Sequence, residues 1–201
     1  MADRSRIGAR DPGVEGMLAF QRGDEGAFDA LVERYSGQVW ALITRFLGPV
    51  AVREDLVQEV FLRVLRSRER YRPTARFSTW LYRIVFNLCV HERERRSGSE
   101  VSLEASAEEE GHGGFDRADD SVRAPFEEME QRDLIEAVRA AIAALPDRQR
   151  MALVLARYEE MSFAEIAEVL DSSEPAIKSL VHRARENLRV SLAPYLAEET
   201  A

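Results

Sequence analysis

The chain has 201 residues, a formal net charge of −8 and one cysteine, Cys89. That length allows one or two small domains, and a single cysteine excludes an intramolecular disulfide and a cysteine-based zinc site. Leu, Ala, Arg and Glu are abundant, while Gly and Pro are sparse and clustered, so the sequence predicts an all-α protein. We find no signal peptide and no apolar run long enough to cross a bilayer, which favours a cytoplasmic location.

The acidic charge is concentrated in one segment. Residues 97–130 contain eleven acidic residues and two arginines, a net charge of −9, so the rest of the chain sums to +1. Ser, Gly, Glu and Asp dominate residues 97–126, which predicts a flexible acidic linker between two helical domains. His112 lies beside glycines in this segment, and a lone His in a flexible segment is a poor metal ligand, so we expect no metal site.

The N-terminal part begins with residues 1–16, which lack periodicity and predict a flexible extension. Helical patterning starts near Met17 and runs to Gly48, with Asp24 as an N-cap. A second long helix is predicted over about 52–68. Its buried stripe should contain Leu56, Val57, Val60, Phe61, Val64 and Leu65. Its other face contains Asp55, Gln58, Glu59 and Arg63, and from spacing alone these predict a solvated surface.

Aromatic residues and arginines alternate in the segment from Tyr71 to Arg96, which contains six arginines and two glutamates. Aromatic rings can stack on unpaired bases and arginines can bind phosphates, so this pattern is typical of a nucleic-acid surface. The alternative is that its apolar residues are the core face of a helix. We expect Tyr71 and Phe77, near the loop-forming Pro73, to be exposed, and Trp80 and Phe86 to be partly buried.

Residues 161–189 have the pattern of a helix-turn-helix. Ser162 and Glu165 form a capping-box pattern before a short apolar helix. Asp171-Ser172-Ser173 interrupts the periodicity, and Pro175 fits only the first turn of a second helix. The second helix should bury Ile177, Leu180, Val181, Ala184 and Leu188 and present Lys178, His182, Arg185 and Arg189 on another face. Such a helix enters the DNA major groove, although an ordinary helical hairpin with a solvated basic face would show the same spacing.

No motif of catalytic chemistry is evident. The sequence has no Gly-rich phosphate loop, no HExxH motif and no nucleophile elbow. We therefore expect no enzymatic activity and no cofactor.

Three motifs in order resemble a known family. They are REDLVQEVFLRVLR, RFSTWLYRIVFNLCVHERERR and, after the linker, LPDRQRMALVLARYEEMSFAEIAEVLDSSEPAIKSLVHRARENLR. Together they resemble an extracytoplasmic-function (ECF, group 4) member of the sigma-70 family of bacterial RNA polymerase initiation factors. The resemblance implies sigma region 2 at 17–96 and sigma region 4 at 127–195, followed by a tail at 196–201.

The resemblance also implies roles for particular residues. The polymerase β′ clamp helices would bind the surface formed by Asp55, Leu56, Gln58 and Glu59. The −10 element would be recognised and melted by Tyr71, Phe77, Trp80, Asn87, Arg93, Arg95 and Arg96, with Tyr71 and Asn87 lining the pocket for a flipped base. The −35 element would be bound by Lys178, His182 and Arg185, with Arg183, Ser172 and Ser173 contacting phosphates or orienting the helix.

Family members often have glycine where Asp171 stands and arginine where Leu180 stands, so Leu180 is expected to pack rather than to contact DNA. The implied partners are core RNA polymerase (β′ clamp helices and β flap), promoter DNA and an anti-sigma factor. Membrane-linked anti-sigma factors inhibit many relatives, without insertion of the sigma factor itself.

Two other classes remain open. A conventional helix-turn-helix regulator would explain residues 127–192 but would leave the DLVQEVF and FSTWLYRI segments without a role. A small helical enzyme would need a catalytic set that spacing does not show. Transcription from a promoter library with core polymerase distinguishes these classes from a sigma factor.

Overall fold

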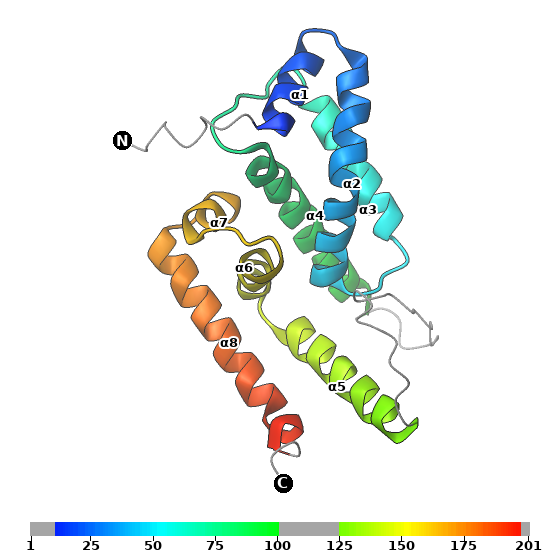
Figure 1. The fold of residues 1–201 in the computed structure, drawn as a ribbon, viewed down its shortest axis with the longest axis vertical. Helices are drawn as coiled ribbons and strands as arrows, with labels where there is room; N and C mark the ends of the chain where they lie inside the picture. Colours follow the sequence, from blue (N-terminus) through cyan, green and yellow to red (C-terminus); the bar gives the residue numbers. More distant parts are fainter. Residues whose placement is uncertain (1–10, 101–124, 198–201) are drawn as a thin grey trace.

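The computed structural model describes residues 11–100 and 125–197, and every regular element in these residues is an α-helix (Figure 1). The all-α prediction is therefore confirmed. The predicted extension at 1–10, most of the predicted linker (101–124) and residues 198–201 lie outside the described residues. The helices are α1 (Pro12–Gln21), α2 (Glu25–Leu47), α3 (Arg53–Arg66), α4 (Phe77–Glu100), α5 (Pro125–Ala144), α6 (Asp147–Tyr158), α7 (Phe163–Val169) and α8 (Glu174–Ala197).

Helices α1–α4 form an N-terminal unit, in which α2, α3 and α4 pack side by side and α1 lies across one end (Figure 1). The expectation that residues 12–16 belong to a flexible extension is wrong, because α1 begins at Pro12. The Asp11 carboxylate accepts hydrogen bonds from Gly13 N (2.9 Å) and Val14 N (3.2 Å) in α1. It also accepts one from Phe77 N (2.9 Å) at the start of α4. One side chain therefore caps two helices and fixes their relative position.

Close packing of α1 depends on Gly13. A Cβ at this position would lie 2.5 Å from both the Phe77 ring and the Tyr35 hydroxyl, so a larger residue would push α1 away. This contact brings α1 over the loop before α4, where the Gln21 side-chain amide donates to the Arg68 and Tyr71 carbonyls at 2.6 and 2.9 Å.

The exposure predicted for Tyr71 and Phe77 is wrong. Tyr71 is 3% exposed and Phe77 is fully buried, because α1 covers the loop that contains them. The Tyr71 ring packs against Phe77 and Trp80, with centroids 6.2 and 4.9 Å apart. Burial raises the pKa of the Tyr71 hydroxyl. These two rings are therefore part of the core.

Helices α5–α8 form a C-terminal unit that contains the helix-turn-helix (Figure 1). The predicted capping box is confirmed, since the Ser162 hydroxyl accepts from Glu165 N (3.3 Å) and the Glu165 carboxylate accepts from Ser162 N (2.9 Å). Pro175 lies in the first turn of α8, and Leu180 packs partly buried against the core, both as expected. Asp171 adopts a left-handed backbone with φ +47°, which explains why glycine suits this turn.

Some predicted boundaries differ from the helix ends. Helix α4 continues to Glu100, α5 starts at Pro125, and α8 continues through Pro194 to Ala197. The linker and tail are therefore shorter than the expected 97–126 and 196–201.

The two units contact one another directly. Helices α6 and α7 pack against α2 and α4, and the buried apolar residues form one continuous cluster across both units. Sequence analysis predicted two domains and a linker but gave no indication of this contact.

Candidate nucleic-acid and polymerase interface

An exposed stripe on α3 includes two of the four predicted polymerase-binding residues. Asp55 and Gln58 are exposed and Glu59 is half-buried, where it pairs with Arg63 (2.9 Å) and Arg66 (3.6 Å). Leu56 is 8% exposed and belongs to the core, which confirms its place in the predicted buried stripe. It therefore offers little surface to the polymerase, the partner that the resemblance implied for it.

Two leucines that the sequence analysis did not assign to a surface complete this stripe. Leu62 and Leu65 are 42% and 40% exposed, although Leu65 was expected in the buried stripe. Residues 55, 58, 62 and 65 are spaced by three, four and three, so they share one helical face. That spacing was readable in the sequence, but the choice of which apolar face is buried depends on how α3 packs on α2 and α4. The result is an apolar patch beside polar groups, as in the core and rim of protein interfaces.

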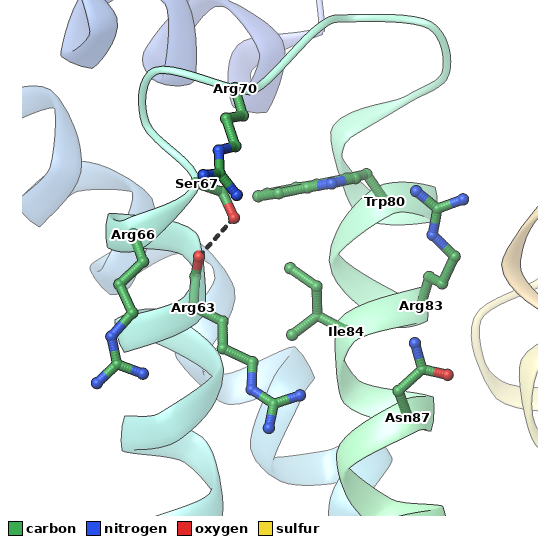
Figure 2. A pocket seen from close by; sticks show the side chains of 8 residues that line it. All are labelled: Arg63, Arg66, Ser67, Arg70, Trp80, Arg83, Ile84 and Asn87. Atoms are coloured by element: carbon green, nitrogen blue, oxygen red, sulfur yellow. Dashed lines mark hydrogen bonds between the residues drawn. The ribbon is translucent and has the colours of Figure 1, made fainter.

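A basic hollow of about 330 Å³ lies between α3 and α4 (Figure 2). It is lined by Arg63, Arg66, Ser67, Arg70, Trp80, Arg83, Ile84 and Asn87. Trp80 and Asn87 were predicted site residues, and the structure brings them together here. Arg83 belongs to the aromatic and basic segment in which a nucleic-acid surface was expected, but Arg63, Arg66 and Arg70 were not predicted as site residues. They come from α3 and the loop after it, and only the packing of α3 on α4 makes them neighbours of Arg83.

Trp80 forms one side of the hollow and packs against two buried aromatic rings. Its ring packs edge-on against Tyr71, with centroids 4.9 Å apart, and at a tilt against Phe77, with centroids 5.5 Å apart. Neither Tyr71 nor Phe77 lines the hollow itself. The prediction that Tyr71 and Phe77 contact the −10 element is therefore corrected: both rings are buried and support Trp80 instead of meeting a ligand.

The three predicted arginines at the end of α4 are all held by carboxylates. Arg93 pairs with Asp147 of the C-terminal unit at 2.6 Å. Arg95 and Arg96 both bind Glu92 at 2.8 Å. Hydrogen bonds from Arg95 and then Arg96 lower the pKa of Glu92 to about 2, although its burial opposes this shift. Phosphate groups would therefore compete with Glu92 for these arginines.

The predicted −35 face on α8 is exposed. Lys178, His182, Arg183 and Arg185 are all exposed. In the described part of the chain, the side chains of Lys178, His182 and Arg185 make no hydrogen bond or ion pair. Ser172 is half-buried, and Ser173 lies at the start of α8, where its hydroxyl accepts from Ala176 N at 3.4 Å. The face is therefore available to a ligand, with Ser173 orienting the helix start.

Among 11–100 and 125–197, no group of three or more His, Cys, Asp or Glu side chains could hold a metal ion. None of the helices seen there is long and apolar enough to span a membrane. Cys89 is fully buried, and burial raises the pKa of its thiol to about 12, so it is an unreactive core residue.

A helical fold with a helix-turn-helix in one unit and a basic, aromatic hollow in the other defines a two-part nucleic-acid-binding protein. The model of Sigma-70 region 2 matches residues 31–98, and the model of Sigma-70 region 4 matches residues 135–188. The chain belongs to the sigma-70 family of RNA polymerase factors and to its ECF group.

Curated relatives match the chain over nearly its whole length. It is 35% identical to the RNA polymerase sigma-H factor of Pseudomonas aeruginosa, over 89% of this chain and 92% of that protein. It is 33% identical to the ECF RNA polymerase sigma factor SigW of Bacillus subtilis, over 86% of this chain and 92% of that protein. It is also 33% identical to the ECF RNA polymerase sigma-E factor of Escherichia coli, over 88% of this chain and 92% of that protein.

Two solved structures share the fold. CnrH in complex with the cytosolic domain of CnrY matches with a TM-score of 0.65 and 24% identity, over 92% of this chain and 99% of that chain. The sigma factor RpoE in complex with the anti-sigma factor NepR from Bartonella quintana matches with a TM-score of 0.59 and 20% identity, over 83% and 96%.

Proposed function

We propose that this sigma factor binds core RNA polymerase, recognises promoter DNA in two parts and promotes melting without bond chemistry of its own. The main support for this proposal is that the two units offer two different surfaces. The N-terminal unit has a hollow in which Trp80 lies among four arginines, and the C-terminal unit has the exposed basic face of α8. One surface suits unpaired bases and the other suits duplex DNA.

Trp80 and Asn87 are the proposed −10 contacts within the hollow. Stacking of a base on an aromatic ring is worth about 1–3 kcal/mol, and extruding a base costs a few kcal/mol. Arg66, Arg70 and Arg83 are exposed at the hollow and would bind the phosphates of the same strand. Because these contacts need unpaired bases, binding shifts the promoter toward the melted state.

On α8, Lys178, His182 and Arg185 are the proposed base-contacting residues for the −35 element. They are exposed and share one face of a helix that follows a helix-turn-helix turn, the geometry that places a helix in the major groove. Arg183 would contact phosphates.

The α3 stripe is the proposed site for the polymerase β′ clamp helices. Leu62 and Leu65 would form its apolar centre and Asp55 and Gln58 its polar rim. The C-terminal unit would bind the β flap. We also propose an anti-sigma partner, which could hold this factor at a membrane, because the two similar solved structures have such partners or a partner cytosolic domain.

Transcription with Escherichia coli core polymerase and a supercoiled promoter library tests the proposal, because that organism has a 33% identical relative. We expect new transcripts that depend on this chain. Leu62→Glu should abolish polymerase binding, whereas Gly37→Glu, which adds the same charge at an exposed α2 position where a side chain meets open space, is the matched control. Sequence-specific DNA binding without polymerase association or transcripts would instead support a conventional helix-turn-helix regulator.

The hollow is tested separately by Arg83→Gln and Trp80→Ala. Arg83 is exposed, so its change should leave folding intact. Both variants should bind polymerase normally and reduce promoter melting, measured by permanganate reactivity of unpaired thymines. Normal melting by both folded variants would contradict a role for the hollow.

A further inference from the structure

The hollow between α3 and α4 has more positive charge than a single nucleotide of a DNA strand can neutralise. Four of the residues that line it are arginines, and none of them is acidic. Each nucleotide within a strand brings one negative phosphate. A free nucleoside triphosphate brings three phosphate groups to one base. The charge of the hollow therefore suits a nucleotide that has several phosphates of its own.

Most of these arginines are available to a ligand. The side chains of Arg70 and Arg83 are exposed and make no hydrogen bond or ion pair in the described part of the chain. Arg63 pairs closely with Glu59 at 2.9 Å, whereas Arg66 lies 3.6 Å from the same carboxylate and its side chain is 66% exposed. Arg66, Arg70 and Arg83 can therefore bind phosphate groups without first breaking a close ion pair.

Trp80 and Asn87 supply the groups that a base needs. Trp80 is partly exposed, and its side chain points from α4 into the hollow (Figure 2). Its contacts with the buried rings of Tyr71 and Phe77 hold the indole in place, so little side-chain freedom is lost when a base stacks on it. The Asn87 amide is exposed two turns further along α4 and can both donate to and accept from a base edge.

The size of the hollow fits one nucleotide. Its volume of about 330 Å³ is the space of about eleven water molecules at about 30 Å³ each. It lies at the lower end of the range of about 300–1,000 Å³ that is usual for small-molecule sites. Trp80 is the one aromatic residue among those that line it, so a second base would find no ring to stack on.

We propose that the hollow binds a free nucleoside 5′-triphosphate, with its base stacked on Trp80 and its phosphates held by Arg66, Arg70 and Arg83. The bound nucleotide competes with unpaired promoter DNA for the same groups. This competition rests on the proposed function, because it lowers the fraction of melted promoter when the holoenzyme is scarce. The binding itself needs neither polymerase nor DNA and can be measured on the free chain.

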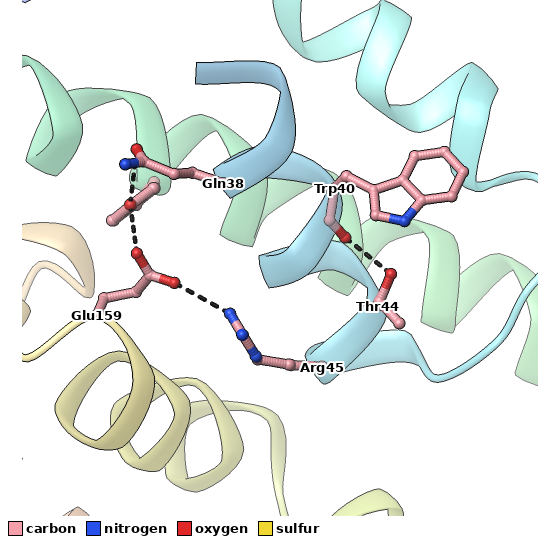
Figure 3. A network of polar contacts seen from close by, with 6 residues as sticks. Gln38, Trp40, Thr44, Arg45 and Glu159 are labelled. Atoms are coloured by element: carbon pink, nitrogen blue, oxygen red, sulfur yellow. Dashed lines mark hydrogen bonds and ion pairs between the residues drawn. The ribbon is translucent and has the colours of Figure 1, made fainter. Parts of the chain in front are cut away.

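Tryptophan fluorescence of the full chain measures this binding once the second tryptophan is replaced. Trp40 lies on α2 under the Arg53 guanidinium, which is 4.7 Å from the ring centroid, and it does not line the hollow. Figure 3 shows Trp40 on the side of α2 away from Arg45, which pairs with Glu159 of the C-terminal unit at 3.3 Å. Trp40→Phe therefore leaves Trp80 as the only tryptophan in the chain.

ATP is the probe, and it should quench the Trp80 emission of the Trp40→Phe chain in a saturable way. Adenosine and inorganic triphosphate, measured by their competition with ATP, should each bind at least tenfold more weakly, because each lacks one half of the contacts. Equal affinity for ATP and inorganic triphosphate would overturn the proposal, since it would show only the attraction of a polyanion to a basic surface. Absence of saturable ATP binding would overturn it as well.

Two arginine variants locate the phosphates. Arg70→Gln and Arg83→Gln should each weaken ATP binding about tenfold, because each removes a charge-assisted contact at an exposed position where folding is unaffected. Arg34→Gln is the matched control: it makes the same change at an exposed α2 position outside the hollow and should leave ATP binding unchanged. Unchanged affinity in both hollow variants would overturn the assignment of the site.

Two tryptophan variants, studied by calorimetry because the fluorescent group is lost, locate the base. Trp80→Tyr retains an aromatic ring and should bind ATP within a few-fold of the unchanged chain, whereas Trp80→Leu should bind at least tenfold more weakly. Circular dichroism checks that both variants fold. Equal ATP affinity of the two folded variants would overturn stacking on Trp80.

Permanganate reactivity of a promoter with limiting holoenzyme tests the competition. ATP, added at constant free Mg²⁺, should lower the reactivity of unpaired thymines, and inorganic triphosphate at the same concentration should lower it less. Unchanged melting at ATP concentrations that saturate the free chain would overturn the competition. If the holoenzyme melts no promoter at all, the proposed function fails, while the fluorescence titration still decides whether the hollow binds a nucleotide.

Discussion

Replacing Arg150 by Met should strongly destabilise the protein. Arg150 is 3% exposed, and its guanidinium donates to the Phe46 carbonyl at 2.8 Å, to the Leu145 carbonyl at 3.0 Å and to the Ala143 carbonyl. It also lies over the Phe46 ring, 5.2 Å from the centroid. The carbonyls belong to the ends of α2 and α5, where helix dipoles favour a cation. Burial lowers the pKa of this guanidinium.

The size of the effect follows from two opposing contributions. A hydrogen bond to a charged group contributes about 1.5–3 kcal/mol, and removing the donor leaves buried carbonyls without a partner. Burying the charge itself costs several kcal/mol, which Met would no longer incur. The apolar stem of Met preserves part of the contact with Phe46. We expect a net loss of about 3 kcal/mol, against a typical total stability of about 5–15 kcal/mol.

Urea unfolding followed by circular dichroism measures this loss. Arg150→Lys should lose less, because an ammonium retains the charge and can reach some of the carbonyls. Arg148→Met is the matched control: Arg148 is exposed and donates to a single carbonyl, that of Leu170, at 2.7 Å. It should cost less than about 1 kcal/mol. A loss below about 0.5 kcal/mol for Arg150→Met would refute the reasoning, since it would place the variant among ordinary surface substitutions.

Three other predictions concern separate residues. Glu92, whose pKa is lowered to about 2, stabilises the fold above its unfolded pKa near 4.5, and this contribution is lost as pH falls toward 2. The full pKa shift corresponds to about 3 kcal/mol of stability, which solvent screening of the exposed Arg95 reduces to about 1–2 kcal/mol. Glu92→Gln should therefore lower the free energy of unfolding in urea by that amount at pH 7 and by less at pH 3. A loss independent of pH would contradict this account. Asp171→Ala should lower stability by about 1 kcal/mol because φ is +47°, whereas Asp171→Gly should not, and equal melting temperatures of the two variants would argue against backbone strain. Lys178→Ala should weaken binding to −35 duplexes in the holoenzyme, and unchanged promoter choice would remove Lys178 from the recognition set.

Local features of the structure followed closely from the sequence. Three local predictions are confirmed: the capping box at Ser162, the N-cap at Asp24 and the place of Pro175 in the first turn of α8. Each depends on a side chain within a few residues of the backbone it affects. The order of three motifs was equally sufficient for the family, which the comparisons confirm.

Burial was predictable only in part. Tyr71 and Phe77 were misplaced because α1, which covers them, starts in a stretch without periodicity and is held by Asp11, more than sixty residues away from Phe77 along the chain. Leu65 was misplaced because both faces of α3 have leucines, and the sequence does not show which face meets α2 and α4.

The amino-acid sequence by itself determined most of the helices, several of their caps, the helix-turn-helix and the family, because these depend on neighbouring residues and on periodicity. Only the tertiary structure decided which arginines surround Trp80, which aromatic rings are buried and that the two units touch through Glu159. Those features join residues from distant helices, and their energies come from packing and desolvation that no local pattern encodes.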